Sequence, residues 1–227
     1  MVSKLNIIAV VATFVVSARA ATTNYCNLKT CGEPNHSICK YGLLTVNRNQ
    51  CGDPKSTGLT RSEIEEVVNL HNSYRAKVAR GLERRGNPGP QPAATNMGNL
   101  SWDTELANIA QTWANQCHYG HDKCRDSARF QVGQNVASNG STADYDAKFT
   151  DMVTMWYEEV KDFNKNQVKS VTDFNGVGHY TQMLWADTKL VGCGGVRYQA
   201  GKWYTTYLVC NYGPTGNWEG EEMYKTR

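Results

Sequence analysis

Eight cysteines constrain this chain more than any other feature of its sequence. Their number is even, all of them lie beyond residue 25, and no two form a Cys-x-x-Cys pair. Zinc fingers use such pairs, whereas exported proteins join an even number of scattered cysteines as disulfides. The pattern therefore predicts four disulfides if the chain reaches an oxidising compartment.

The start of the chain predicts that destination. Lys4 gives a positive start, Leu5 to Val16 is an apolar run, and Ala18-Arg19-Ala20 fits the small-x-small cleavage rule. The run is too short to span a bilayer, and no second apolar segment of spanning length follows. We therefore expect a signal peptide at residues 1–20 and a secreted, extracellular product without a membrane span. A secreted chain that still began at Met1 in N-terminal sequencing would contradict this.

Size and charge limit what the exported chain can be. Residues 21–227 are enough for one domain with a sizeable core. The formal net charge of the full chain is +3, and removal of Lys4 and Arg19 leaves about +1, which is no basis for binding nucleic acid. Exported chains also carry glycans at Asn-x-Ser/Thr sequons, and the candidates here are Asn35, Asn99 and Asn139.

Residues 21–58 differ in composition from the rest of the chain. Four of the cysteines lie there among Gly, Pro, Asn and Lys, and neither a helical nor a strand period persists. We interpret this segment as a loop-rich, cysteine-rich N-terminal extension. Disulfides are expected to hold it to the main domain, residues 59–227.

Three helices are predicted in the main domain. The first begins at a capping box, Thr60-Arg61-Ser62-Glu63, and continues with apolar residues at helical spacing. The second is capped by Ser101 or Asp103. The third runs from about Asp144 to Phe163.

Strands are expected later in the chain. Val191–Tyr198 and Trp203–Asn211 flank a Gly201-Lys202 turn and predict a hairpin. Residues from Tyr180 onward alternate aromatic, polar and aliphatic side chains and predict a half-buried strand, whereas Gly133–Val136 is interpreted as a turn. Helices that interleave with a late group of strands, without βαβ alternation, predict an α+β fold.

The hairpin also predicts one disulfide. A two-residue loop places Ala200 opposite Trp203, and the same register places Cys193 opposite Cys210. Counting back from the loop makes this a non-hydrogen-bonded pair. In such a pair the Cα atoms approach to about 4.5 Å, so a disulfide can form.

Four polar residues are candidates for a functional site. His71 lies on the apolar stripe of the first helix, and Glu159 lies on that of the third, where an acid needs a partner. Gln134 lies in the predicted turn, and His179 stands at the entry to the predicted strand. Together they suggest a metal or acid/base site, although such histidines also serve as satisfied core groups. Two other histidines are expected on solvent-facing loops: His118 and His121.

Four motifs, in this order, resemble the CAP superfamily of cysteine-rich secretory proteins, venom antigen 5 and plant pathogenesis-related proteins. They are His71-Asn72-Ser73-Tyr74-Arg75, Gly133-Gln134-Asn135-Val136, Gly178-His179-Tyr180-Thr181-Gln182-Met183-Leu184-Trp185, and the segment from Tyr207 to Trp218. The resemblance extends from about Thr60 to the C-terminus. The cysteine-rich start is similar to insect venom antigen 5 in particular.

This resemblance implies a fold and a site. The fold is a three-layer α-β-α sandwich with the disulfide-held extension, and its central cleft carries two histidines and two glutamates. The implied cleft residues are His71, Gln134, Glu159 and His179, so an amide replaces one carboxylate. Three further disulfides are implied: Cys26–Cys39, Cys31–Cys124 and Cys51–Cys117.

The function implied first is that of a secreted venom or salivary protein similar to the antigen 5 allergens. Such a protein binds an unidentified host or extracellular target, has no catalytic residues and requires no cofactor. Lipid or sterol carriage, which some family members perform, is the second hypothesis. The aromatic residues available to line a lipid groove are Phe149, Trp156, Phe163 and Phe174.

The third hypothesis is a metal-dependent hydrolase. His71, Glu159 and His179 would bind a divalent cation such as zinc, with water in the open position. The chain has neither a His-Glu-x-x-His nor a Gly-x-Ser-x-Gly motif, and its even cysteine count leaves no free thiol. Because Gln134 offers only a neutral oxygen, we expect the cleft to bind metal weakly and to lack hydrolase activity.

Overall fold

The computed structural model describes residues 23–32 and 34–227, so the predicted signal peptide lies outside the described residues. The elements follow in this order: η1 (Tyr25–Asn27), α1 (Ser37–Tyr41), α2 (Arg48–Cys51), β1 (Ser56–Thr57), α3 (Arg61–Ala79), β2 (Ser101–Trp102), α4 (Thr104–Ala114), β3 (Gly133–Ser141), α5 (Phe149–Glu158), η2 (Glu159–Lys161), η3 (Lys165–Gln167), α6 (Gly178–Met183), β4 (Leu190–Ala200) and β5 (Trp203–Gly213). Within these ranges, no helix combines the length and the apolar character needed to cross a membrane.

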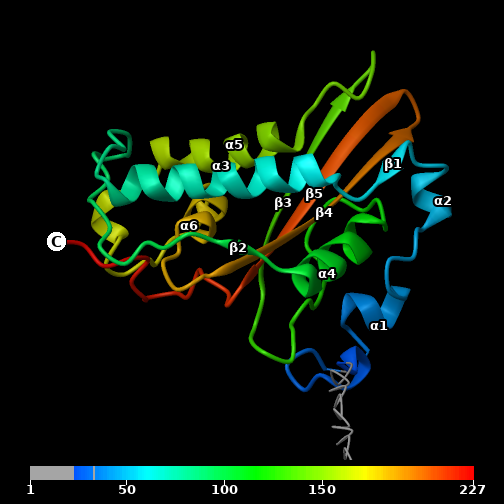
Figure 1. The fold of residues 1–227 in the computed structure, drawn as a ribbon, viewed down its shortest axis with the longest axis horizontal. Coiled ribbons are helices and arrows are strands. Elements are labelled where there is room, and N and C mark those ends of the chain that lie inside the picture. Colours follow the sequence, from blue (N-terminus) through cyan, green and yellow to red (C-terminus); the bar gives the residue numbers. More distant parts are fainter. Residues whose placement is uncertain (1–22, 33) are drawn as a thin grey trace, which may run out of the picture.

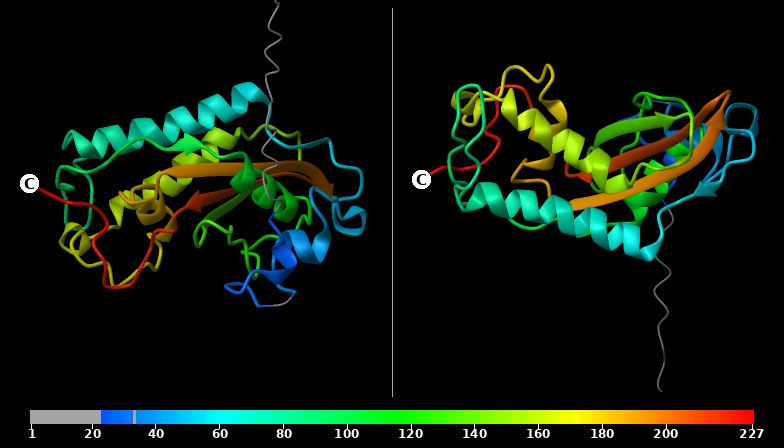
Figure 2. Two further views of the ribbon diagram at one scale, coloured as in Figure 1. Left: turned by 60° about the horizontal axis from the view of Figure 1, so that its bottom comes forward. Right: turned by 90° about the horizontal axis from the view of Figure 1, so that it is seen from above.

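A five-stranded sheet forms the middle layer of the molecule. Its order is β1-β4-β5-β3, all antiparallel, and β2 joins β4 in parallel. Helices α3 and α5 lie on one face and α4 on the other (Figures 1 and 2). Two neighbouring glycines of β4 contact opposite helix layers. A Cβ on Gly194 would lie 2.3 Å from the Gln111 backbone of α4, and a Cβ on Gly195 would lie 2.4 Å from the Phe149 ring of α5. The predicted α+β sandwich of three layers is confirmed.

Apolar side chains fill both spaces between the layers. Strand β5 alternates between them, because Leu208 and Cys210 belong to the core beneath α3 and α5, whereas Val209 belongs to the core beside α4. This period of two is that of a strand buried on both faces. The larger core also contains Trp156 and Tyr180, which flank the candidate site.

Helix α3 begins where the sequence predicts it. The Thr60 side chain accepts from the Glu63 amide, and the Glu63 carboxylate accepts from the Thr60 amide, which completes the capping box. Farther along the helix, the buried Arg75 guanidinium donates to the carbonyls of Met183 and Trp185, each at 2.9 Å. Arg75 therefore ties α3 to the end of α6, the helix that carries His179.

Helix α5 is shorter than predicted. It begins at Phe149 instead of Asp144, because the Ser141 hydroxyl accepts from the amides of Ala143 and Asp144 and turns the chain after β3. It ends at Glu158, and Glu159 opens the 3₁₀ turn η2. Glu159 keeps the inward direction that the helical spacing predicts.

The prediction of a strand from Tyr180 is wrong, because Gly178–Met183 form helix α6. Tyr180, Met183 and Leu184 are buried at the i, i+3, i+4 spacing of a helix. The Glu159 carboxylate accepts from the amides of His179 at 2.9 Å and Tyr180 at 3.0 Å, and so satisfies donors at the start of the helix.

Gly133–Val136 is likewise a strand and not a turn. These residues begin the edge strand β3, which pairs with β5 from Gly133 opposite Tyr212 onward. The polar side chains of this segment can be buried because other side chains form hydrogen bonds with them.

The β4–β5 hairpin has the predicted register. Ala200 pairs with Trp203 and Cys193 with Cys210, whose Cα atoms lie 4.0 Å apart in a disulfide. The other disulfides join the three pairs that the resemblance implies: Cys26–Cys39, Cys31–Cys124 and Cys51–Cys117. The extension is more regular than expected, since it forms α1 and α2 and adds β1 to the sheet edge.

Candidate functional site

A cavity of about 240 Å³ opens between β3, η2 and the start of α6. Its polar walls bring together residues from five separate parts of the chain. They are His121, Gln134, Asn135, Glu159, His179 and Asn217.

Glu159 and His179 form the most tightly bonded pair of this cleft. Glu159 Oε1 lies 2.6 Å from His179 Nδ1, while Oε2 accepts the two amides of α6. The Trp156 ring stacks on the His179 ring, with centroids 6.0 Å apart and planes at 21°. His179 and the start of α6 are therefore the partners that the Glu159 carboxylate requires. The other ring nitrogen of His179, Nε2, has no hydrogen-bond partner among the described residues.

Gln134 is held in one orientation by its neighbours. Its Nε2 donates to Asn211 Oδ1 at 3.0 Å and to Asp122 Oδ1 at 3.2 Å, so Oε1 is the acceptor. His121 Nδ1 lies 2.8 Å from this Oε1 and must carry the proton. Burial, reinforced by the positive charge of Arg125, lowers the pKa of His121.

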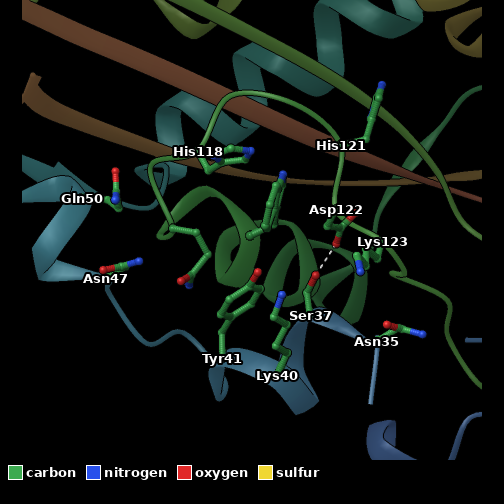
Figure 3. A pocket seen from close by; sticks show the side chains of 12 residues that line it. Asn35, Ser37, Lys40, Tyr41, Asn47, Gln50, His118, His121, Asp122 and Lys123 are labelled. Carbon is green, nitrogen blue, oxygen red and sulfur yellow. Dashed lines mark hydrogen bonds between the residues drawn. The ribbon is translucent and has the colours of Figure 1, made fainter. Parts of the chain in front are cut away.

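His121 lies on an exposed loop, as expected, but the sequence interpretation missed that its side chain also lines the cleft. Figure 3 shows its ring directed away from Tyr41 and Lys40. One signal in the sequence could have found it. His121 is three residues before Cys124, and the Cys31–Cys124 disulfide holds that loop against the main domain.

His71 lies behind the cleft, which corrects its expected place in the cleft wall. Its side chain is fully buried, with Nδ1 2.8 Å from the Val67 carbonyl oxygen and Nε2 2.9 Å from the Tyr212 hydroxyl. Asn135 continues this chain of contacts, since its Nδ2 donates to Tyr212 at 3.3 Å and to the His179 carbonyl at 3.1 Å. Burial above all, and the Arg75 charge, lower the pKa of His71 to about 4. His71 is thus a satisfied core histidine that supports the cleft.

The predicted metal ligands His71, Glu159 and His179 do not converge. Among the residues that the structure describes, the one group of three ligand atoms within 4.8 Å comprises Cys31, Cys124 and Asp126, and a disulfide occupies both of its sulfurs. The donors left to a cation in the cleft are Nε2 of His121 and Nε2 of His179. In each ring a bonded Nδ1 orients the free nitrogen, the arrangement usual for metal-binding histidines.

The three sequons lie in different surroundings. Asn99 and Asn139 are exposed, whereas Asn35 is half-buried and its Nδ2 donates to the Cys31 carbonyl at 3.3 Å. All three remain candidates for glycosylation.

Comparison with known proteins agrees with the fold and the motifs. A family model described as the cysteine-rich secretory protein family (CAP) matches residues 68–212. A venom allergen 5 of Vespula maculifrons is 50% identical over 100% of this chain and 99% of its own length. The solved structure of BmVAL-1 is 30% identical, with a TM-score of 0.65 over 78% of this chain and 87% of its own. A crystal structure of NaASP2 with Zn²⁺ is 28% identical, with a TM-score of 0.63 over 75% and 88%.

Proposed function

The chain belongs to the cysteine-rich secretory protein (CAP) family and is similar to venom allergen 5, and from this premise we propose that it is secreted and acts by binding a target without catalysis. The observation that supports this most directly is the bonding of Glu159. Both of its oxygens already accept hydrogen bonds, from His179 Nδ1 and from two amides of α6.

A hydrolase of this cleft would need a group that activates water. Glu159 is the single carboxylate among the polar residues that line the cleft, and its bonds are used to hold His179 and α6 in place. Gln134 stands where the family has a second carboxylate, and an amide neither takes up nor releases a proton near neutral pH. Glu159 and Gln134 therefore supply no general base, and the groups that could take up a proton, the free Nε2 atoms of His121 and His179, are the ones proposed to bind metal instead.

The proposal includes weak metal binding through His121 and His179. A bound divalent cation would supply Lewis acidity at the mouth of the cleft. Two neutral imidazoles and a neutral amide attract such an ion less than a site with a carboxylate ligand does. The structure of a relative with Zn²⁺ supports zinc as the ion to test.

Zinc titration by calorimetry tests this proposal. The wild type should bind weakly, Gln134→Glu more tightly, and Gln134→Glu with His179→Ala no better than the wild type. The matched control is Gln199→Glu, which adds the same charge at an exposed residue of β4 and should change nothing. Submicromolar binding by the wild type together with zinc-dependent peptide cleavage would overturn the non-enzymatic proposal.

Lipid carriage remains the alternative, but the aromatic residues offered for it have another role. Phe149, Trp156 and Phe163 are each at most 2% exposed and belong to the larger core. Phe174 lines the cleft instead. Native mass spectrometry of the secreted protein would reveal a co-purified lipid, which would favour the alternative.

A further inference from the structure

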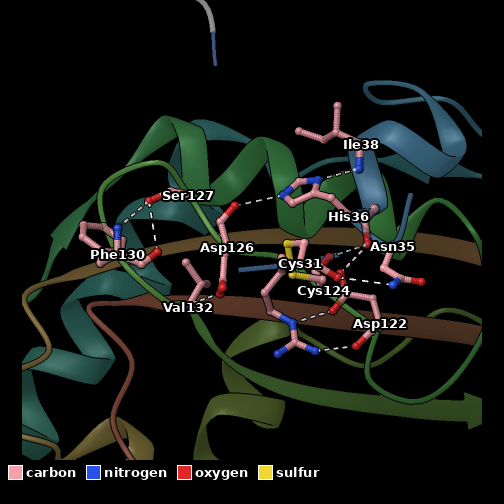
Figure 4. The surroundings of a disulfide bond; sticks show 12 residues. Cys31, Asn35, His36, Ile38, Asp122, Cys124, Asp126, Ser127, Phe130 and Val132 are labelled. Atoms are coloured by element: carbon pink, nitrogen blue, oxygen red, sulfur yellow. Dashed lines mark hydrogen bonds and ion pairs between the residues drawn. A yellow bond between two sulfur atoms is a disulfide. The ribbon is translucent and has the colours of Figure 1, made fainter. Parts of the chain in front are cut away.

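A second cavity, of about 390 Å³, lies between the N-terminal extension and the main domain (Figure 3). The extension forms one wall with α1, α2 and the segment between them, and the end of α4 with residues 118–123 forms the other. Two disulfides, Cys31–Cys124 and Cys51–Cys117, join these walls, and Figure 4 shows the first of them. The cavity is therefore preformed, so a ligand would not have to order its walls.

The buried amide of Gln116 provides a fixed acceptor in this cavity. Gln116 is only 5% exposed, and its Nε2 donates to the carbonyls of Thr112 at 2.9 Å and Thr45 at 3.1 Å. Both amide hydrogens are thus used, which sets the direction of Oε1. Oε1 accepts no hydrogen bond within the described part of the chain, yet it is not sealed from solvent as Gln91 Oε1 is. A ligand hydroxyl could donate to it.

Three rings give the cavity an apolar surface. The Tyr41 and Trp113 rings have centroids 6.0 Å apart, and the His118 ring meets Trp113 edge-on at 5.8 Å. Trp113 Nε1 donates to the Gly120 carbonyl at 2.8 Å, so the indole also fixes the loop that carries His118.

The charges in the cavity are positive. Lys40 and Lys123 are exposed and form no salt bridge with any described residue, and Lys40 Nζ lies 4.9 Å from the centre of the Tyr41 ring. The nearby carboxylate of Asp122 is buried and already bound by Ser37, Arg125 and Gln134. An anionic ligand would therefore meet two free ammonium groups and no free carboxylate.

We propose that this cavity binds an acidic sugar, a pyranose ring that carries a carboxylate. The flat carbon–hydrogen face of the sugar packs on the half-buried Tyr41 ring, which is supported by Trp113 (5% exposed), and its hydroxyls bond to Gln116 and to the free amides of Asn47 and Gln50. Lys40 and Lys123 hold the carboxylate. The inference goes beyond the proposed function, because it assigns a ligand class to a site that uses neither Glu159 nor His179.

Nuclear magnetic resonance titration of the ¹⁵N-labelled protein with D-glucuronate and D-glucose tests the proposal, because these sugars differ only at C6. The protein is produced in the bacterial periplasm, which adds no glycan at Asn35. Glucuronate should shift the Trp113 indole and Gln116 amide resonances, and glucose should bind about tenfold more weakly, the effect of one charge-assisted hydrogen bond. A disaccharide that ends in glucuronate should bind more tightly than free glucuronate if the ligand is a unit of a chain, and less tightly if it is the free acid.

Substitutions then locate the site. Lys123→Ala and His118→Ala should each weaken glucuronate binding, whereas Lys161→Ala, which removes the same charge from an exposed position elsewhere, should not. Glu159→Gln should leave glucuronate binding unchanged, because Glu159 lies in the cleft and not in this cavity. A failure of the function proposed for the cleft would therefore leave this test intact. Equal affinity for glucose and glucuronate, the same shifts with acetate at equal concentration, or equal losses in Lys123→Ala and Lys161→Ala would overturn the proposal.

Discussion

The imidazole nitrogens in and behind the cleft differ in what they can still bind. In His71 both nitrogens are bonded and the ring is fully buried, whereas His121 and His179 each have Nδ1 bonded and Nε2 free. The difference arises from position in the fold, because α3 carries His71 into the core while the loop and α6 carry the other two to the surface of the cleft. His71 is therefore expected to affect stability, and the other two to affect metal binding.

The pH dependence of stability tests this role of His71. Its pKa is about 4 in the folded protein and near 6.5 in the unfolded chain, so the unfolded chain takes up the proton first as the pH falls. The stability is therefore complete above pH 6.5 and is lost between pH 6.5 and 4, by roughly 3 kcal/mol. Urea denaturation at several pH values should show this slope, and His71→Gln should remove most of it. The same slope in both proteins would contradict the prediction. A smaller slope should persist in the variant, since burial also lowers the pKa of His36 and of His121.

Single residues were predictable from the sequence where a local rule governs them. The apolar spacing of α3 and α5 correctly predicted that His71 and Glu159 point inward. That spacing does not show how deeply a side chain is buried, and the place of His71 in the cleft was implied by the resemblance alone. No helical or strand period surrounds His121, and its position depends on the disulfide between Cys31 and Cys124, which are 93 residues apart in sequence.

Among the elements, α6 depends most on a distant residue. Val177 gives it no side-chain cap, and the Glu159 carboxylate fills that role from η2. A segment of six residues fits both a helical and a strand period, so the sequence pattern alone could not distinguish them. Helix α3 was predicted correctly because its capping box lies within its own sequence.

Removing the charge of Glu159 should therefore destabilise α6. Glu159→Gln loses charge-assisted bonds to two helix amides and to His179, and we expect the free energy of unfolding to fall by about 1–2 kcal/mol. The adjacent Glu158→Gln is the matched control. Glu158 makes an exposed ion pair with Arg85, so its loss should cost no more than about 1 kcal/mol. Equal losses measured by chemical denaturation would show that Glu159 does not cap α6.

At the scale of the whole molecule, the extension and the main domain meet at the loop of residues 118–123, whose His121 lines both cavities. Asp122 joins them, because it accepts from Ser37 of α1 and from Gln134 of β3. The three layers follow the resemblance, and the hairpin register follows from its two-residue loop. The cavity between extension and domain could not be predicted, because it depends on how the disulfides place two segments that carry no periodic pattern.

Removal of the Cys31–Cys124 disulfide tests whether the extension holds the cleft in place. The bond closes a loop with a sequence separation of 93, so replacing both cysteines by serine should lower the free energy of unfolding by about 4–5 kcal/mol. It should also release the loop that carries His121 and weaken zinc binding further. The control replaces Cys26 and Cys39, whose bond spans only 13 residues and does not touch that loop, so stability should fall by roughly 3 kcal/mol with zinc binding unchanged. If zinc binding were unchanged in the Cys31/Cys124 variant as well, His121 would not depend on the extension for its position.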